Sequence, residues 1–393
     1  MNIPSWPYYS DDEIKSACSV LSSGLVNYWT GTETKNFEKE FAKLISAKYA
    51  IALANGSLAL SCAYLALNLK KGDEIITTPR TFIATSSSAL LLGLKPVFAD
   101  VDLNSGCITA ETIEPLITEK TRAITVVHIA GWPADMEKIS ALANKYKLFI
   151  IEDCSQAHGA EIFINKRFQP VGSFGTIATW SFCQDKIIST GGEGGMITTN
   201  DLEIFEKIWS FKDHGKNLKK LDNNQFKSGF KWLHDNLGSN FRLTEFQSAI
   251  GRLQIKKLFY WNKLRTRNAL ILADKLNNIH ALRIPLPSRE VKHAWYKFNC
   301  FLNLSELKNE WSRNRIIDEI NKKGYPAFHG GCSEIYLEKC FKEKGVSPQG
   351  RLKVAKELGE TNLMFLVHPN ISNKEMSKYA ETIYSVIKNS IKS

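Results

Sequence analysis

The sequence lacks any long hydrophobic run. Its longest apolar runs, such as residues 89–94, are far too short to cross a bilayer. The opening segment also lacks the basic-then-apolar order of a secretory signal. We therefore expect a cytoplasmic protein with no membrane-spanning segment.

Cysteine pairs with metal-binding or redox spacing are also missing. None of the eight cysteines stands in a Cys-x-x-Cys pair, which excludes the common zinc-finger and thioredoxin patterns. Several lie in apolar segments, where a free thiol behaves as a small hydrophobic group. We expect reduced, structural cysteines and no metal site. They are Cys18, Cys62, Cys107, Cys154, Cys183, Cys300, Cys332 and Cys340.

A concentrated basic surface is not present either. The net charge is +11 and the sequence pI is near 9.1, but the lysines are scattered, and "KNLKK" (216–220) is their densest cluster. No basic helix face alternates with aromatic residues, as nucleic-acid binding would favour. We expect a solvated surface, or attraction of anionic small molecules, rather than a nucleic-acid partner.

Strand and helix patterns alternate along the first part of the chain. Two amphipathic helices, the first capped by Ser10 and stopped by Gly24, precede apolar strands within 49–57, 73–93, 95–102, 123–131 and 148–155. Unbroken apolar strands separated by helices are typical of α/β domains with a mostly parallel sheet. From about residue 240 a long amphipathic helix leads into shorter strands and helices.

We therefore predict two domains. An N-terminal segment and a large α/β domain occupy residues 1–250, and a smaller α+β domain occupies residues 251–393. The polar and aromatic stretch 215–237 has no clear periodicity and is interpreted as an ordered loop.

Two βα turns carry candidate ligand groups. Ligands of α/β sheets gather at the carboxyl ends of strands. The strand in "YKLFIIEDCSQAHGA" brings Glu152 and Asp153 to such an end, where a carboxylate can bind a metal or a cation, act as a base, or simply cap a helix. The turn "LANGSLAL" places Gly56 and Ser57 at a helix N-terminus, which can bind an anion, although many such turns bind nothing.

Lys186 stands in "CQDKIISTGGEGG". A phosphate-binding P-loop has its glycines before the lysine and a helix after it, whereas here the glycines follow and a strand pattern comes next. Desolvation among apolar residues and glycines would free the lysine amine as a nucleophile, while the alternative is a surface lysine. A lysine, a carboxylate and an anion site together suit pyridoxal 5'-phosphate (PLP).

At these residues the chain resembles the DegT/StrS-type sugar aminotransferases, which have the type I fold of PLP enzymes. The resemblance covers nearly the whole chain, including "SGLVNYWTGTETKNFEKEFA", "ANGSLAL", "TTPRTFIATSSS", "EDCSQAHGA", "WSFCQDKIISTGGEGGMITTND", "GSNFRLTEFQSAIG" and "HAWY". It implies that Lys186 forms the Schiff base and moves the substrate proton, and that Asp153 pairs with the pyridine nitrogen. It also implies a homodimer with shared active sites.

The resemblance implies further cofactor contacts. Gln156 would lie near the phenolic oxygen and Phe82 would stack on the ring, although Phe82 could be a core aromatic. Gly56, Ser57 and Ser181 would hold the phosphate, with Asn240 reaching it from the neighbouring subunit unless Asn240 only caps a helix. Trp29, His293 and His329 match positions near the substrate. Phe182 and His158 are interpreted as structural.

The chain departs from the family pattern at two active-site loops. Ala130 and Trp132 replace a common tyrosine and glutamine, and "WSFCQDK" differs from the usual "FSFYPTK". These differences put the usual sugar substrate in doubt. One branch of the family has histidine in place of the lysine and dehydrates sugars, and Lys186 argues against that branch.

The resemblance implies transfer of an amino group from L-glutamate to a keto or aldehyde sugar by a ping-pong route. The product would enter cell-surface polysaccharide or lipopolysaccharide. The acceptor is either a nucleotide-linked sugar or, as in the branch that forms 8-amino-3,8-dideoxy-octulosonate, a free acidic sugar. The competing interpretations are a PLP-binding regulator that contacts DNA and a PLP sugar dehydratase. Glu193 has no assigned role.

Overall fold

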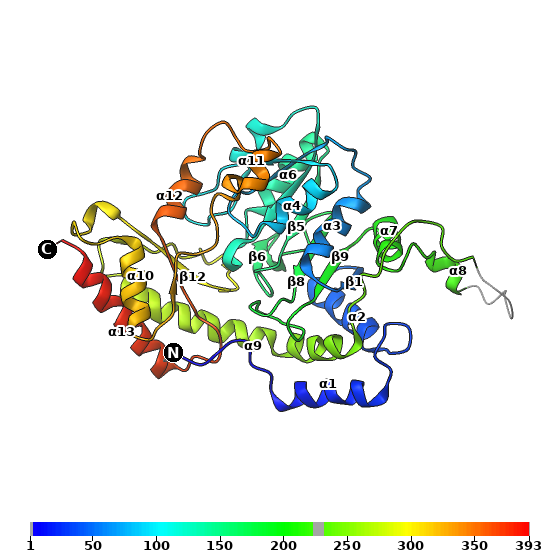
Figure 1. The fold of residues 1–393 in the computed structure, drawn as a ribbon, viewed down its shortest axis with the longest axis horizontal. Helices are drawn as coiled ribbons and strands as arrows, with labels where there is room; N and C mark the ends of the chain where they lie inside the picture. Colours follow the sequence, from blue (N-terminus) through cyan, green and yellow to red (C-terminus); the bar gives the residue numbers. More distant parts are fainter. Residues whose placement is uncertain (1–2, 223–231, 393) are drawn as a thin grey trace.

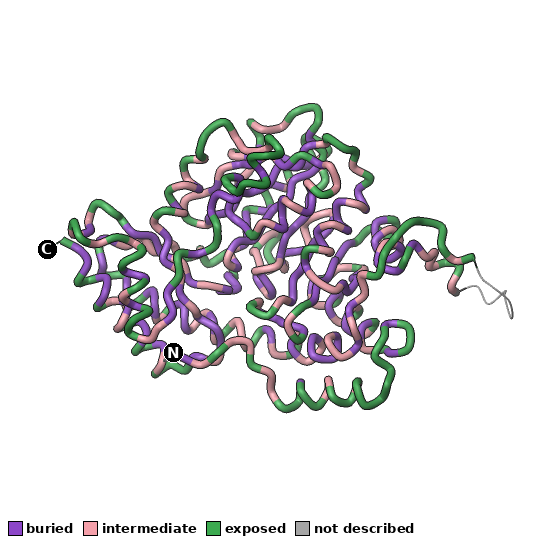
Figure 2. Tube along the Cα trace, in the orientation of Figure 1, coloured by how far each residue is buried: buried purple, intermediate pink, exposed green. Residues whose placement is uncertain are grey.

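The N-terminal helices form where the sequence predicts them. The structure is a computed structural model that describes residues 3–222 and 232–392 (Figure 1). Helix α1 (Asp11–Ser23) begins after Ser10, whose backbone N–H donates to the Glu13 carboxylate at 2.7 Å, and it ends at Gly24 with φ +70°. Helix α2 (Glu33–Ile45) follows. Figure 2 shows that α1 is largely exposed along the outside of the molecule.

A seven-stranded sheet forms the centre of the large part. Its order is β1 (Tyr49–Leu53), β9 (Gly195–Thr199), β8 (Ile177–Ser181), β5 (Phe149–Asp153), β4 (Thr121–Val127), β2 (Glu74–Thr77) and β3 (Lys95–Phe98). All neighbouring pairs from β8 to β3 are parallel, while β9 pairs antiparallel with both β1 and β8. The predicted fold class, with a mostly parallel central sheet, is confirmed.

Both faces of this sheet are covered by helices. Ile75 and Ile76 are neighbours on β2 and fully buried, yet they belong to different core clusters because successive side chains point to opposite faces. Helices α3 (Gly56–Ala66) and α7 (Leu202–Lys212) contribute to the first cluster, and α6 (Met136–Tyr146) contributes to the second. The strands therefore present their carboxyl ends, rather than a face, to ligands.

The C-terminal part is built on a smaller antiparallel sheet. Its order is β10 (Leu282–Arg283), β12 (Phe298–Leu302), β14 (Asn362–Phe365) and β13 (Ala327–Phe328). Helices α9 (Glu245–Leu276), α10 (Arg313–Lys322) and α13 (Asn373–Ser390) pack on it (Figure 1). The remaining elements are α4 (Ala84–Leu91), α5 (Ala110–Ile113), α8 (Leu218–Asp222), α11 (Lys339–Glu343), α12 (Lys353–Thr361), the sheet β11 (Val291–Lys292), β6 (Glu161–Ile164) and β7 (Arg167–Pro170), and 3-10 turns at 114–116, 129–131, 304–306 and 335–337.

The long helix α9 joins the two parts. The predicted boundary at residue 250 falls inside this helix, and Ile3 from the N-terminal segment packs in the core of the C-terminal part. The division into two domains stays a prediction. In the predicted loop 215–237, residues Leu218–Asp222 form helix α8, and residues 223–231 lie outside the described residues.

No helix among the described residues is long and apolar enough to cross a membrane. The eight cysteines are unpaired, and Cys62, Cys107, Cys154 and Cys300 are buried, as the sequence predicts.

Candidate active site

A cavity of 1080 Å³ lies where the carboxyl ends of the strands face the C-terminal part. The sheet supplies residues just after β1, β2, β4, β5 and β8, and the C-terminal part supplies residues near β12, β13 and β14. Gly56, Ser57, Phe82, Asp153, Gln156, Ser181 and Lys186, which were all predicted to bind the cofactor, line this one cavity.

Asp153 is the buried carboxylate of the cavity. Its side chain ends β5 and is 4% exposed. The Thr85 hydroxyl donates to its Oδ2 at 2.8 Å, and the backbone N–H of Ser155 donates to its Oδ1 at 3.2 Å. Asp153 has no ion-pair partner among the described residues. A buried anion of this kind is stabilised when a cation enters the cavity beside it, and a protonated pyridine nitrogen meets that requirement.

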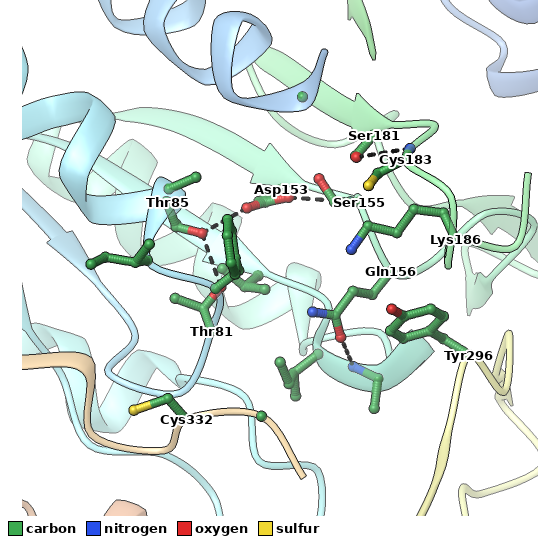
Figure 3. A pocket seen from close by; sticks show the side chains of 18 of the residues that line it. Thr81, Thr85, Asp153, Ser155, Gln156, Ser181, Cys183, Lys186, Tyr296 and Cys332 are labelled. Atoms are coloured by element: carbon green, nitrogen blue, oxygen red, sulfur yellow. Dashed lines mark hydrogen bonds between the residues drawn. The ribbon is translucent and has the colours of Figure 1, made fainter. Parts of the chain in front are cut away.

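The Lys186 amine points into the same cavity, toward the space between Asp153 and Gln156 (Figure 3). Its side chain is 14% exposed, and Nζ lies 5.2 Å from the centre of the Tyr296 ring and 4.0 Å from Oδ1 of Asp185. The Trp6 indole donates to the Lys186 carbonyl at 2.8 Å, which ties the N-terminal segment to the loop. The lysine is therefore a sheltered amine rather than a surface residue.

The N-terminus of α3 is the candidate anion site. The Asn55 side chain accepts a hydrogen bond from Leu58 N at 2.9 Å, which leaves the N–H groups of Gly56 and Ser57 without a helical partner. Ser181 adds a hydroxyl beside them. A Cβ at Gly56 would lie 2.7 Å from Cβ of Ser181, so no larger residue fits there. Backbone donors, a helix dipole and a hydroxyl suit a phosphate.

The glycines after Lys186 shape the wall of the cavity. Gly191 and Gly192 have φ values of +78° and +115°, which favour glycine. A Cβ at Gly195 would lie 2.4 Å from the carbonyl oxygen of Asn55, so β9 passes very close to the anion site. Glu193 is exposed at the edge of the cavity, and its carboxylate accepts a weak hydrogen bond from Sγ of Cys183 at 3.8 Å.

Gln156 and Phe82 complete the predicted cofactor contacts. Gln156 Oε1 accepts from the backbone N–H of Ala130 at 2.7 Å, which fixes the amide in the cavity. The Phe82 side chain is 68% exposed, so its ring is free to stack on a ligand and is not a core aromatic.

The three predicted substrate residues lie outside the large cavity. Trp29 is 39% exposed and packs on Trp209 with the Lys216 amine over its ring. His293 is buried and stacks on Trp295, beside a second cavity of 20 Å³, and His329 is exposed. Burial lowers the pKa of His293 to about 3, so its ring is neutral. Contact of these residues with substrate stays a prediction.

Asn240 does not line the cavity of its own protomer. It is exposed, and its side chain accepts from the backbone N–H of Arg242 at 3.3 Å. Its predicted role in a neighbouring subunit stays a prediction. Phe182 is fully buried and His158 is 1% exposed between Trp180 and Phe182, in agreement with structural roles for both.

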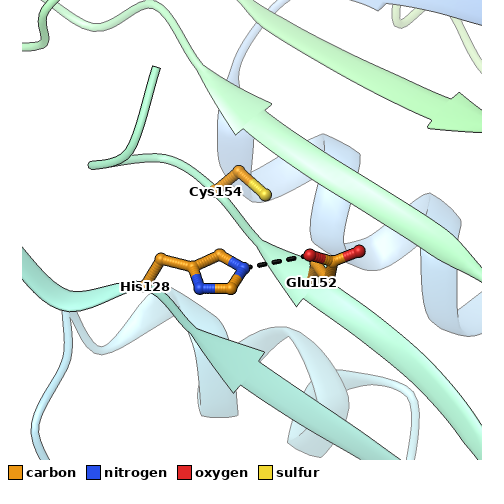
Figure 4. A group of neighbouring side chains, drawn as sticks. All are labelled: His128, Glu152 and Cys154. Atoms are coloured by element: carbon orange, nitrogen blue, oxygen red, sulfur yellow. Dashed lines mark hydrogen bonds and ion pairs between the residues drawn. The ribbon is translucent and has the colours of Figure 1, made fainter. Parts of the chain in front are cut away.

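One buried cluster has the composition of a metal site. The ligand atoms of His128, Glu152 and Cys154 lie within 4.8 Å of one another (Figure 4). However, His128 Nδ1 accepts from Ala134 N at 3.0 Å, so its Nε2 carries the proton and donates to Glu152 at 3.0 Å. The Glu152 carboxylate also accepts three backbone N–H bonds, from residues 172, 174 and 175. Both ring nitrogens of His128 and both carboxylate oxygens of Glu152 therefore already have hydrogen-bond partners, and the cluster is structural.

Several residues of the site were missed from the sequence. Thr85 and Asp153 are 68 residues apart in the sequence. Their hydrogen bond forms only because the fold brings α4 next to the end of β5. A signal was available in "TTPRTFIATSSS" and "HAWYKF", since both segments place polar groups beside predicted site residues. The missed residues are Arg80, Thr81, Thr85, Tyr296, Lys297 and Asn299.

Solved structures and curated relatives resemble this chain along most of its length. It is 47% identical to an aminotransferase from Psychrobacter cryohalolentis, with a TM-score of 0.95 over 98% of this chain and 99% of that one. It is 38% identical to a dTDP-3-amino-3,6-dideoxy-α-D-galactopyranose transaminase of Aneurinibacillus thermoaerophilus over 73% of this chain and 74% of the relative. It is 33% identical to a UDP-N-acetyl-3-dehydro-α-D-glucosamine 3-aminotransferase of Acidithiobacillus ferrooxidans over 90% and 88% of the two chains.

The cofactor follows from the same comparisons. A GDP-4-keto-6-deoxy-D-mannose-3-dehydratase of E. coli, solved with hydrated PLP, is 27% identical with a TM-score of 0.85 over 98% of this chain and 99% of that one. The sheltered Lys186 amine, the unpaired Asp153 carboxylate and the N-terminus of α3 fit this cofactor. The sequence profile of the DegT/DnrJ/EryC1/StrS aminotransferase family matches residues 7–384. The chain belongs to this family of PLP-dependent aminotransferases, whose named relatives act in sugar biosynthesis.

Proposed function

We propose that the protein transfers the amino group of L-glutamate to a keto or aldehyde group of a sugar and leaves 2-oxoglutarate. The observation that carries this proposal is the shared cavity of Lys186 and Asp153. At 1080 Å³ this cavity lies at the upper end of the usual size of ligand pockets, which leaves room for a sugar beside the cofactor.

The residues of this chain have separate tasks in such a reaction. PLP supplies an electron sink for the bond electrons released at the substrate carbon. Asp153 holds the proton on the pyridine nitrogen, and the hydroxyl of Thr85 holds Asp153 in place at 2.8 Å. The Lys186 amine takes the proton from the substrate carbon and returns it, because it points into the cavity toward the space between Asp153 and Gln156. Gly56, Ser57 and Ser181 bind the phosphate.

The two substrates use the same cavity in turn. PLP would carry the amino group between the two half-reactions, so glutamate alone should react without an acceptor. The test is to mix purified protein carrying PLP with glutamate and to measure 2-oxoglutarate. About one equivalent per cofactor is expected. No 2-oxoglutarate and an unchanged cofactor spectrum would reject glutamate as the donor.

We also propose a homodimer in which Asn240 of one protomer reaches the phosphate site of its partner. Asn240 is exposed and lies outside the cavity of its own protomer. Exposed large apolar side chains are frequent in the N-terminal segment and in the segment that precedes Asn240, as expected for surfaces covered on assembly. They are Tyr8, Ile14, Leu21, Leu25, Val26, Trp29, Trp232 and Leu237.

The identity of the sugar acceptor is the most specific part of the proposal. We infer a nucleotide-linked keto-deoxysugar destined for cell-surface polysaccharide or lipopolysaccharide, in a cytoplasmic reaction. The alternative is a free acidic sugar, aminated to 8-amino-3,8-dideoxy-octulosonate. A panel of nucleotide-linked and free keto-sugars, offered to the enzyme after glutamate treatment, separates these acceptors by which one regenerates PLP.

A dehydratase or a DNA-contacting regulator fits the site less well. The amine of Lys186 stands where the dehydrating branch would have a histidine, and a sheltered nucleophile beside a buried carboxylate has no use in a regulator. If the purified protein removed water from a sugar without transferring an amino group to it, the dehydratase would be favoured instead.

A further inference from the structure

The inner wall of the large cavity carries three hydrogen-bond donors for which the described residues supply no acceptor. They are the guanidinium of Arg80, the amine of Lys297 and the side-chain amide of Asn299, and all three also line the small cavity of 20 Å³ behind this wall. Arg80 follows β2 in the large part, whereas Lys297 and Asn299 flank the start of β12 in the C-terminal part. The three residues therefore converge from both parts of the molecule.

Arg80 is a buried cation without a counter-ion. The residue is 5% exposed, and its guanidinium lies 5.7 Å from the centre of the Phe301 ring. Its side chain has neither a hydrogen bond nor an ion pair with any described residue. A Cβ at Gly106 would lie 2.1 Å from its Nη1, so the side chain is also closely held by the backbone next to it. A fixed, desolvated guanidinium is prepared for a planar anion.

Lys297 adds a second positive charge. Its amine lies 4.7 Å from the centre of the Tyr296 ring, and it has no carboxylate within the 4.0 Å of an ion pair in the described part of the chain. Asp185, the acidic group that influences it most, instead accepts a hydrogen bond from the Tyr296 hydroxyl. Lys297 is thus available to a ligand in the cavity.

Asn299 is oriented as a donor. Its Oδ1 accepts from Nδ2 of Asn362 at 3.0 Å, so the acceptor end of the amide is occupied. Its NH₂ group has no partner among the residues that the structure describes. Two cations and one oriented amide favour an anion over a sugar hydroxyl, which would need acceptors as well.

We propose that Arg80, Lys297 and Asn299 bind a carboxylate of the substrate, at a distance from the amino or keto group that reacts. This inference rests on the proposed function, and it names the substrate class as carboxylates. The carboxylate has two sources, namely the amino donor, as in glutamate, and an acidic sugar acceptor. The phosphate of the cofactor is not a source, because the N-terminus of α3 holds it elsewhere.

The first test measures binding without turnover. The PLP form of the protein is titrated calorimetrically with 2-oxoglutarate and, separately, with a sugar acid. Arg80→Met and Lys297→Met keep an unbranched, flexible side chain and remove its charge. Each variant is expected to weaken binding roughly tenfold or more, the effect of losing a hydrogen bond between charged groups.

Matched controls separate this effect from a general loss of charge. Arg283 also lies over the Phe301 ring, at 4.5 Å, but donates to the Leu103 carbonyl and does not line either cavity. Lys292 lies on β11, ion-paired with Glu161. Arg283→Met and Lys292→Met are expected to bind both probes as the wild type does. PLP content and circular dichroism confirm that all four variants fold.

The second test identifies the source of the carboxylate. If the site holds the side-chain carboxylate of the donor, Arg80→Met abolishes the preference for glutamate over glutamine in the first half-reaction. If it holds the carboxylate of the acceptor, Arg80→Met raises the KM for acidic keto-sugars and leaves that for neutral ones unchanged. Either result supports the proposal.

The proposal is overturned if the wild type binds neither carboxylate probe, or if Arg80→Met and Lys297→Met bind within about twofold of the wild type. Failure of the proposed function looks different. In that case 2-oxoglutarate binds and the variants weaken it, but glutamate leaves the cofactor unchanged.

Discussion

The hydroxyl of Thr85 donates a 2.8 Å hydrogen bond to Oδ2 of Asp153, and Thr81 lies 2.9 Å from the same hydroxyl (Figure 3). Because the Thr85 hydrogen is used by Asp153, the Thr81 hydroxyl must donate to Thr85. All three residues are buried and line the large cavity, so two hydroxyls in series fix one carboxylate there. We therefore propose Thr85 as a positioning residue for Asp153, the carboxylate proposed to hold the proton on the pyridine nitrogen.

Thr85→Val should weaken catalysis through Asp153. The substitution keeps the shape of the side chain and removes the hydrogen bond to a charged group, which is worth about 1.5–3 kcal/mol. We expect kcat to fall roughly tenfold or more with little change in the KM for glutamate. Ser86→Ala is the control, because Ser86 is fully buried on the same helix and its hydroxyl has no partner in the described structure. Equal kcat values for the two variants would contradict this role.

Asp153→Asn should nearly abolish transamination. An amide has the same shape but carries no charge to hold the pyridine proton, so we expect a loss of roughly 100-fold or more in kcat. Asp100→Asn is the comparison, since the Asp100 carboxylate caps α12 by accepting from Val354 N and Ala355 N at 2.9 Å and lies outside the cavity. It should lower thermal stability and keep activity. Activity retained in Asp153→Asn would reject the assigned role.

Binding of anionic substrates should weaken above pH 8. The pKa of Lys297 is lowered to about 8, chiefly by burial; Asp185 opposes this shift, and Arg265 and Lys186 contribute to it. The protonated fraction of Lys297 therefore falls as pH rises through about 8, and its attraction for a carboxylate falls with it. The KM for glutamate should rise above this pH in the wild type. A KM that rises equally in Lys297→Met would show that another group titrates.

His158 should make the protein sensitive to acid. Burial lowers the pKa of His158 to about 3, with Lys186 and Arg265 adding to the effect, and neither ring nitrogen has a hydrogen-bond partner in the described structure. Between pH 6.5 and 3 the unfolded chain binds a proton here that the folded chain does not. This lowers stability by about 1.4 kcal/mol per pH unit as pH falls.

The corresponding variant is His158→Phe, which keeps an aromatic ring between Trp180 and Phe182. It should lose less thermal stability than the wild type on going from pH 7 to pH 5, as measured by the unfolding midpoint. An identical loss in both proteins would mean that other groups determine the acid response.

Sequence patterns predicted the residues that act locally and in a fixed order along the chain. Asp153 at the end of an apolar strand and Gly56 at a strand–helix turn are places where the backbone alone directs a group to the ligand edge. The local pattern of Lys186 also allowed a surface lysine, and only its combination with a carboxylate and an anion site, together with the family resemblance, identified it; the structure brings all three to one cavity.

Residues whose role depends on distant packing could not be predicted in this way. Arg80 and Lys297 are separated by more than half of the chain, and each alone resembles an ordinary surface cation. Arg80 is buried because the C-terminal part packs over the edge of the sheet. None of the described residues supplies a counter-ion for it there. His293 was expected near the substrate because it matches a family position; the structure places its buried ring against Trp295, and its contact with substrate stays a prediction.

The most direct test of the account is to locate the covalent attachment of the cofactor. The PLP form is reduced with borohydride, digested and mapped by mass spectrometry, with and without prior exposure to glutamate. The account predicts a pyridoxyl group on Lys186 in the untreated protein, its loss after glutamate, and no labelling in Lys186→Ala. A label on another lysine, or one on Lys186 that glutamate does not remove, would contradict it.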